Sequence, residues 1–228
     1  MCAASVEKWP PLSEGLDDLA MNVLAIGAHF DDLELGCSGT LARHVCQGDR
    51  VTMLVVTHSA YKDPRGRVVR AAGDALEEGR LSAQIIGAEL VCLGCGTLEV
   101  SFDDSLCGAL LEHIERLEIG MIYSHWIHDV HRDHQVVARS ALMAGKRVPR
   151  FLMYRSNLYD ASEQFVGSFY SDISDTINVK LEAVGAHKSE LRRVRGEWLE
   201  TVSEQGRSNG RRIGVAYAES FEVVRYLV

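Results

Sequence analysis

The strongest constraint on the fold is a set of short apolar runs that alternate with segments of helical spacing. The runs lie at 22–28, 51–57, 89–93 and 121–125, and the helical segments at 41–47, 68–86, 106–117 and 135–144. Near-continuous apolar runs of this length are typical of parallel strands buried on both faces. Strands that alternate with helices favour an open α/β sheet. We therefore expect a Rossmann-like, mostly parallel sheet with helices on both faces.

The last third of the chain is less regular. Residues 151–156 predict a fifth strand, 165–170 a further strand and 177–195 a helix, whereas 221–227 is ambiguous. A chain of 228 residues suits one domain. We divide it into a polar leader at 1–20 and a single domain at 21–228.

Composition excludes several classes of protein. The chain is 46% hydrophobic and 25% charged, with a formal net charge of −8, so it has no overall basic surface for nucleic acid. Its first residues lack the apolar core of roughly 7–15 residues found in secretory signals. No stretch approaches the roughly 20 apolar residues of a membrane span. We expect a cytoplasmic protein without a transmembrane segment.

The six cysteines are interpreted as reduced thiols, because they fall in predicted strands, helices and their edges. Cys92 and Cys95 form a C-x-x-C pair without a matching second pair, which favours buried strand-end thiols over a metal ribbon.

Polar residues gather directly after two of the predicted strands. The segment AHFDDLELG follows the first strand and contains His29, Asp31 and Asp32. The segment HWIHDVHRDHQ follows the fourth and has a histidine at every third position, namely His125, His128, His131 and His134. In an open sheet of order 3-2-1-4 the first and fourth strands are neighbours, and ligands bind beyond their carboxyl ends. The two segments are therefore expected to face each other.

Such a meeting would suit a catalytic metal. Hydrolytic zinc sites take three imidazole or carboxylate ligands and leave one position for water. His29, Asp32 and His134 can supply this set, for zinc or, because these ligands select weakly, for Fe(II) or Co(II). Asp31 would remain as an unligated carboxylate that accepts the water proton. His131 would donate a proton or stabilise an oxyanion.

Two further acidic residues belong to the expected site. Asp133 is predicted to orient the ring of His131. Asp129 is a candidate for a hydrogen bond to one of the metal-binding residues, without contacting the metal itself.

The two segments also carry a resemblance. AHFDDLELGCSGTLA resembles the signature A-H-P-D-D-x-E-x-G-x-G-G-T-L of the PIG-L/LmbE-like zinc de-N-acetylases, and H-R-D-H at 131–134 resembles their H-x-D-H motif. Segments 180–191 and 217–225 resemble the closing segments of the family. The resemblance implies zinc on His29, Asp32 and His134, with Asp31 as general base and His131 as acid or oxyanion stabiliser.

The sequence departs from the family pattern at three places. Phe30 replaces the usual proline, Ser38 a common glycine, and Ala75 a frequent arginine, so substrate contacts in that helix cannot be carried over. Candidate substrate contacts elsewhere are His58, His187 and the loop residues Tyr61, Arg65 and Arg67.

The expected function is removal of the N-acetyl group from an amino sugar or glycoside, which releases acetate and a free amine. The expected partner is that small molecule, with a homo-oligomer left open. Two alternatives stay open: a nucleotide- or sugar-binding α/β module, and a scaffold without activity. The first is weaker because neither G-x-G-x-x-G nor G-x-x-x-x-G-K-[ST] is present.

Overall fold

A seven-stranded mixed sheet forms the centre of the molecule. The computed structural model describes residues 20–157 and 159–228, so the expected leader lies outside the described residues except for its last residue. The strands of the sheet, in spatial order, are β5 (Glu89–Cys95), β2 (Arg50–Thr57), β1 (Asn22–Gly27), β6 (Met121–His125), β7 (Arg150–Tyr154), β9 (Ala218–Tyr226) and β8 (Phe169–Asp172). The first five are parallel, and the last two pair antiparallel. The expected open α/β sheet is confirmed.

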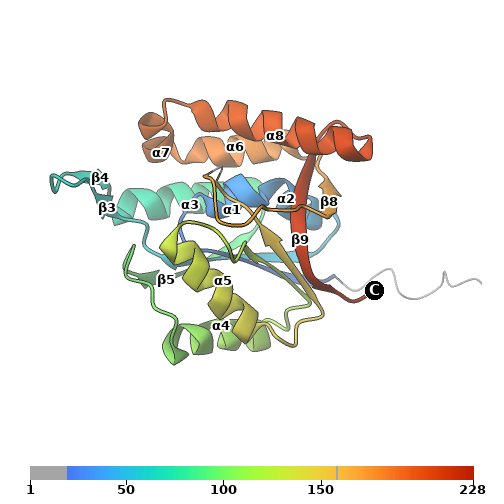
Figure 1. Cartoon of the computed structure of the whole chain (residues 1–228), viewed down its shortest axis with the longest axis horizontal. Helices are drawn as coiled ribbons and strands as arrows, with labels where there is room; N and C mark the ends of the chain where they lie inside the picture. Colours follow the sequence, from blue (N-terminus) through green and yellow to red (C-terminus); the bar gives the residue numbers. More distant parts are fainter. Residues whose placement is uncertain (1–19, 158) are drawn as a thin grey trace, which may run out of the picture.

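Helices cover both faces of the sheet (Figure 1). One face carries α4 (Asp104–Arg116) and α5 (Arg132–Ala144). The other face carries α1 (Asp32–Gly36), α2 (Ser38–Cys46) and α3 (Ala72–Ile86). A further layer lies above these helices and consists of α6 (Ile177–Ala186), α7 (Lys188–Arg193) and α8 (Glu197–Ile213).

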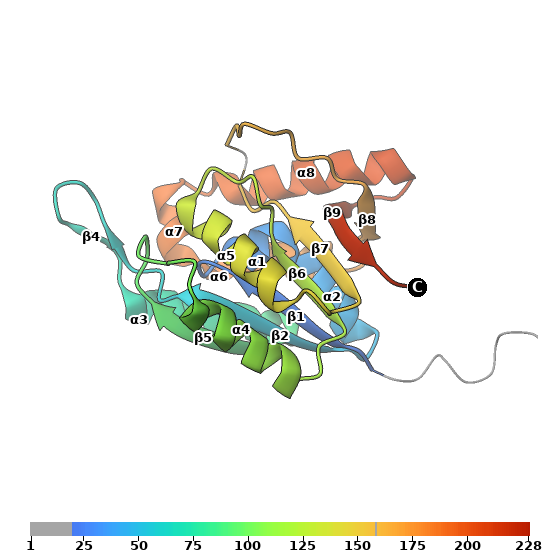
Figure 2. The ribbon, with the colours of Figure 1, turned by 60° about the horizontal axis from the view of Figure 1, so that its bottom comes forward.

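Three local features differ from the sequence-based expectation. The segment 68–70 is strand β4 (Val68–Arg70), which pairs with β3 (Tyr61–Lys62) in a hairpin that projects from the body (Figure 2), so α3 begins only at Ala72. The helix expected at 177–195 is broken at His187 into α6 and α7. Helix α8 was not predicted, because its glycines lower helix propensity. One of them, Gly210, is required by packing, since a Cβ there would lie 2.6 Å from the Val215 carbonyl oxygen.

The C-x-x-C pair does not form one site. The Cys92 side chain packs with the small core group on the α3 face of the sheet, whereas that of Cys95 packs with the core on the α4 and α5 face. The two cysteines therefore point to opposite sides of β5.

A buried ion pair connects β9 to the first helices. The Glu219 carboxylate accepts hydrogen bonds from the backbone N–H groups of Gly39 (3.1 Å) and Thr40 (2.7 Å), at the start of α2. The Lys180 ammonium lies 2.6 Å from it and also donates to the Glu34 carbonyl oxygen at 2.9 Å. The carboxylate compensates the partial positive charge of the unpaired N–H groups at the N-terminus of α2. The ammonium compensates the partial negative charge of the unpaired carbonyl groups of α1.

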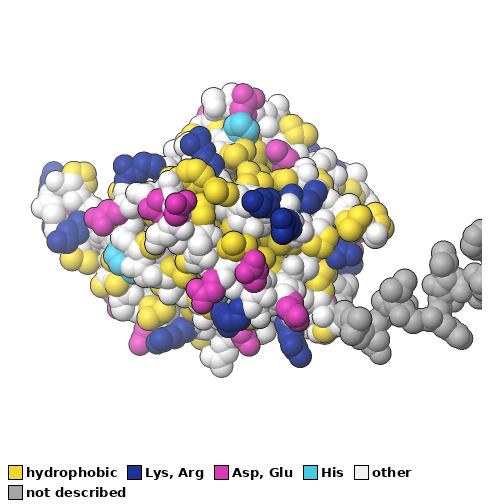
Figure 3. Space-filling view, turned by 90° about the horizontal axis from the view of Figure 1, so that it is seen from below, with side chains coloured by type: hydrophobic (Ala, Val, Ile, Leu, Met, Phe, Trp, Pro, Cys, Tyr) yellow, Lys and Arg dark blue, Asp and Glu magenta, His cyan; other side chains and the backbone are white. Residues whose placement is uncertain are grey.

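The exposed surface is mixed in charge. On the face seen in Figure 3, acidic and basic side chains are interspersed. Within residues 20–157 and 159–228, no helix combines the length and the apolar character that crossing a membrane requires.

We predict that Glu219→Ala lowers the free energy of unfolding by about 3–5 kcal/mol, because it leaves the Lys180 ammonium buried without its counter-charge. Urea denaturation followed by circular dichroism measures the loss. Glu182→Ala, at an exposed position of α6, is the matched control and should stay within about 0.5 kcal/mol of the parent. Equal stabilities for the two variants would show that the buried pair does not hold β9 in place.

Candidate metal centre and active site

The parallel pairing of β1 with β6 brings the two polar segments together. Val23 pairs with Met121 and Ala25 with Tyr123, so both strands end at the same edge of the sheet. His29 and Asp32 follow β1, and His134 lies in the first turns of α5, which follows β6. The predicted meeting of the two segments is confirmed by the contact between His29 and His134.

Donor atoms of three residues converge at this edge. His29 Nδ1 lies 3.3 Å from Asp32 Oδ2, His134 Nε2 lies 3.1 Å from Asp32 Oδ1, and the two ring nitrogens are 3.3 Å apart. Zinc bonds of about 2.0–2.1 Å in a tetrahedral site place neighbouring donors roughly 3.3 Å apart. The separations therefore fit a cation held by all three residues.

Each imidazole is backed by a carboxylate on its other nitrogen. His29 Nε2 lies 3.1 Å from Asp133 Oδ2, and His134 Nδ1 lies 3.1 Å from Asp129 Oδ2. An N–H directed at a carboxylate leaves the lone pair of the opposite nitrogen for a metal, and metal-binding histidines commonly have this arrangement. The remaining nitrogen of each ring lies within 3.3 Å of the Asp32 carboxylate.

The electrostatics of the cluster also favour a cation. Burial alone would lower the pKa of His29, but hydrogen bonds with Asp133 and Asp32 raise it to about 9. Burial opposes the charge on His134 in the same way, and Asp32 and Asp129 raise its pKa to about 10. The surrounding carboxylates thus stabilise positive charge at this point, and a divalent cation satisfies the same demand when it displaces these protons. We conclude that the His/Asp cluster can hold a metal ion.

Two further combinations of possible donors overlap with this set, namely His29, His131 and His134, and Asp32, His125 and His134. His125 is fully buried at the end of β6, and its Nε2 accepts the backbone N–H of Ala28 at 2.9 Å. Burial and the adjacent His134 lower its pKa to about 4. Because its lone pair is already used, His125 supports the cluster as a neutral packing residue rather than as a ligand.

His131 stands beside the cluster with its ring centroid 4.8 Å from that of His29. Its Nδ1 accepts the backbone N–H of Asp133 at 3.2 Å, which leaves the ring proton on Nε2. Burial and His134 lower its pKa to about 4, so the ring is neutral at neutral pH. The Asp133 carboxylate does not orient this ring as the sequence suggested. It contacts His29 instead, and it also accepts the Leu98 N–H at 2.7 Å.

Asp31 lies next to the cluster in a strained backbone conformation. Its φ of 123° is rare for a residue with a side chain, and strain of this kind is found at functional sites. The Arg70 guanidinium holds it by donating to Asp31 Oδ2 (3.0 Å) and to the Phe30 carbonyl oxygen (2.7 Å). Burial and the Asp32 carboxylate raise the pKa of Asp31 to about 7, although Arg70 opposes the shift.

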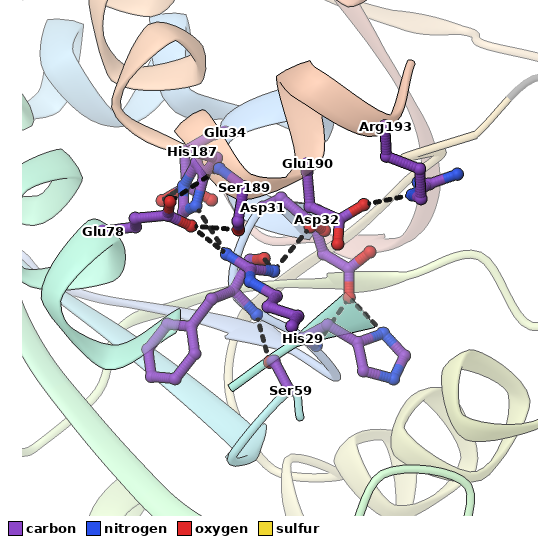
Figure 4. Close-up of polar contacts among 12 residues, drawn as sticks. His29, Asp31, Asp32, Glu34, Ser59, Glu78, His187, Ser189, Glu190 and Arg193 are labelled. Carbon is purple, nitrogen blue, oxygen red and sulfur yellow. Dashed lines mark hydrogen bonds and ion pairs between the residues drawn. The ribbon is translucent and has the colours of Figure 1, made fainter. Parts of the chain in front are cut away.

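Arg70 is the most important residue that sequence reasoning missed. It is 2% exposed and also donates to Glu78 Oε2 at 3.0 Å and to His187 Nδ1 at 3.1 Å (Figure 4). No pattern in the sequence pointed to it, because it precedes the family's usual arginine position at Ala75 and lies in an unexpected hairpin.

A cavity of about 560 Å³ opens above the cluster, and its lining includes His29, Asp31, Asp32, His131 and His134. Of the predicted substrate contacts, only Tyr61 lines it. Arg65 is exposed in the hairpin turn and His58 lies outside the lining. His187 is fully buried, with Nε2 located 3.1 Å from Glu34 Oε1, so it supports Arg70 instead of reaching substrate.

Comparison with known proteins identifies the class. The model of the GlcNAc-PI de-N-acetylase (PIG-L) family matches residues 24–144. The uncharacterized deacetylase YaiS of Escherichia coli (strain K12) is 29% identical over 181 residues, which is 73% of this chain and 90% of that protein. The diacetylchitobiose deacetylase of Thermococcus kodakarensis is 29% identical over 201 residues, which is 79% of this chain and 73% of that protein.

The fold agrees with this result. The crystal structure of the conserved protein TT1542 from Thermus thermophilus superimposes with a TM-score of 0.78 at 25% identity, and it covers 91% of this chain and 96% of its own. The chain belongs to the PIG-L/LmbE-like de-N-acetylase family. It is a deacetylase of that family, and thus an amidohydrolase.

Phe30, one of the residues that depart from the family pattern, lies in the turn that carries Asp31. Its ring is buried against Gly79 of α3, where an added Cβ would lie 2.3 Å from Phe30 Cδ1. Gly79 is therefore required by the close approach of this ring.

We predict that Gly79→Ala lowers the free energy of unfolding by about 1–3 kcal/mol through overpacking. The control is Gly108→Ala in α4, where the described residues place no neighbouring atom within 4 Å of the new Cβ, and it should stabilise by up to about 1 kcal/mol through helix propensity. Urea denaturation of both variants measures the difference. A gain in stability for Gly79→Ala would mean that the Phe30 ring is not fixed there.

Proposed function

We propose that this protein is a zinc-dependent deacetylase that removes the acetyl group from an N-acetylated amino sugar or glycoside. The proposal is supported above all by the convergence of His29 Nδ1, Asp32 and His134 Nε2, with a carboxylate behind each imidazole. An unligated carboxylate and a neutral histidine stand next to this point, at the floor of a cavity. These are the groups that hydrolysis of an amide requires.

His29, Asp32 and His134 would hold the cation. When bound, a divalent cation polarises the acetamide carbonyl and makes an attacking water more acidic. Asp32 is kept in place by the Ser156 hydroxyl, which donates to Oδ1 at 3.1 Å, and by the His29 backbone N–H, which donates to Oδ2 at 2.7 Å. The three donors are thus oriented by the protein before any cation arrives.

Asp31 and His131 would perform the proton transfers and stabilise developing charge. Asp31 is held by Arg70 beside the cluster, where it can take a proton from the attacking water. The Nε2–H of His131 can donate a hydrogen bond to the carbonyl oxygen as negative charge develops on it. Asp31 then returns its proton to the leaving amine, so that acetate and a free amino sugar result.

We predict that the purified protein binds about one zinc ion per chain and that His134→Ala loses most of this affinity, because two ligands cannot complete the site. The loss should exceed the roughly 10–100-fold cost of removing an outer hydrogen-bond partner. Metal content by mass spectrometry and calorimetric titration of the apoprotein measure it. His128→Ala, an exposed histidine of the same segment, should keep full occupancy. Full occupancy in His134→Ala would remove His134 from the ligand set.

We predict that Asp31→Asn keeps its metal while kcat falls by about 10²–10⁴, the usual contribution of a general base. Asparagine has nearly the same shape as aspartate and its oxygen can still accept a hydrogen bond from Arg70, so the turn should survive the change. Acetate release from N-acetylglucosamine and its glycosides, together with metal content, provides the test. Asp32→Asn should instead lose metal affinity first. If Asp31→Asn lost the metal and turned over normally with excess zinc, the two aspartates would exchange roles.

A further inference from the structure

The wall of the cavity away from the His/Asp cluster is built by the N-terminal half of α8. The lining residues of this helix are Glu197, Trp198, Thr201, Val202 and Gln205, which share one helical face. Val194, between α7 and α8, also lines the cavity. No step of the proposed hydrolysis uses these side chains. They lie in the part of the cavity that the remainder of a substrate would occupy.

A chain of contacts holds this wall in place before any ligand binds. The buried Glu190 carboxylate accepts the Tyr61 hydroxyl at 2.8 Å on one oxygen. Its other oxygen accepts Arg193 Nε at 2.6 Å (Figure 4). The Arg193 guanidinium carbon lies 5.8 Å from the centre of the Trp198 ring. Because hairpin, α7 and α8 are joined in this way, the indole is preorganised beside the cavity.

A further apolar side chain lines the cavity from a different part of the chain. Leu98, in the β5–α4 loop, lines the cavity although its side chain is 50% exposed. Its backbone has a φ of 64°, which is uncommon for leucine, and its N–H is bound by Asp133. A strained position that keeps an apolar side chain exposed at a cavity indicates contact with a ligand.

We propose that Trp198, Val194 and Leu98 form a subsite for an apolar or aromatic aglycone, so that the preferred substrates are N-acetyl amino sugar glycosides carrying such a group. This inference rests on the proposed function. Large apolar side chains on two separate elements suit an alkyl or aryl group, which gains affinity by leaving water. Glu197, Thr201, Gln205 and Arg193 also line this wall and offer hydrogen-bond partners to a second sugar ring, so a disaccharide is the competing occupant that the experiment must separate.

The test compares acetate release from four compounds by the zinc-loaded full chain. They are methyl, octyl and 4-nitrophenyl N-acetyl-β-glucosaminide and N,N′-diacetylchitobiose. We expect kcat/KM for the octyl and nitrophenyl glycosides to exceed that for the methyl glycoside by roughly 10–100-fold, mainly through a lower KM, as burial of a large apolar group implies.

Two variants locate the effect. Trp198→Ala should reduce the octyl-to-methyl ratio of kcat/KM toward one. Leu98→Asn, whose side chain suits the positive φ, should lower the same ratio from the opposite element. Arg192→Ala, in the preceding helix α7, is the control, because Arg192 is exposed and outside the lining, and it should leave the ratio unchanged.

The outcomes separate the two proposals. Equal kcat/KM for methyl and octyl glycosides, a preference for the disaccharide over both apolar glycosides, or an unchanged ratio in both variants would overturn the aglycone subsite and leave the deacetylase intact. Absence of acetate release from all four compounds with zinc bound would overturn the proposed function and, with it, the subsite.

Discussion

The parallel pairing of β1 with β6 is the constraint on which the site depends. The two polar segments are about a hundred residues apart in the chain, yet the register that matches Ala25 with Tyr123 brings both to one edge of the sheet. Backbone hydrogen bonds of a buried sheet set this register with little freedom, because a shift by one residue would move each side chain from the core on one face of the sheet to the differently shaped core on the other. The donor atoms of His29, in the short turn directly after β1, and of His134, in the first turns of α5, therefore meet at positions that the sheet fixes.

The aspartates of the His/Asp cluster bring together negative charge that other groups must compensate. Four aspartates, Asp31, Asp32, Asp129 and Asp133, surround two imidazoles, and the raised pKa values of His29 and His134 express how strongly this environment favours a cation. Isolated carboxylates in such surroundings would be costly, since burial removes their hydration. A metal ion held here would neutralise the cluster in a way that links binding to folding. Charge balance and catalysis thus depend on the same few side chains.

A second buried network supports the strained turn. Arg70 connects the Phe30 carbonyl oxygen and the Asp31 carboxylate to Glu78 and His187, so one guanidinium holds the turn to α3 and to the start of α7. Planar guanidinium groups suit this role because they present several donors in fixed directions. The same helical layer continues into α8, which forms the outer wall of the cavity. The general-base candidate is therefore held directly by Arg70 of β4, whereas the C-terminal third of the chain supports Arg70 through His187 and forms one wall of the cavity.

The sequence by itself determined the sheet, the order of its first four strands and the segments that carry His29, Asp32 and His134, because apolar runs and strand ends are local patterns. Only the tertiary structure decided that Asp133 contacts His29 rather than His131, that Arg70 holds Asp31, and that His187 is buried. It also decided that α8 closes the cavity. The contacts of Asp133 with His29, of Arg70 with Asp31 and of Arg70 with His187 join residues 104, 39 and 117 positions apart, and they depend on backbone placement and burial. Local periodicity does not predict such long-range contacts, because they depend on the paths of irregular segments such as the β3–β4 hairpin and the break at His187.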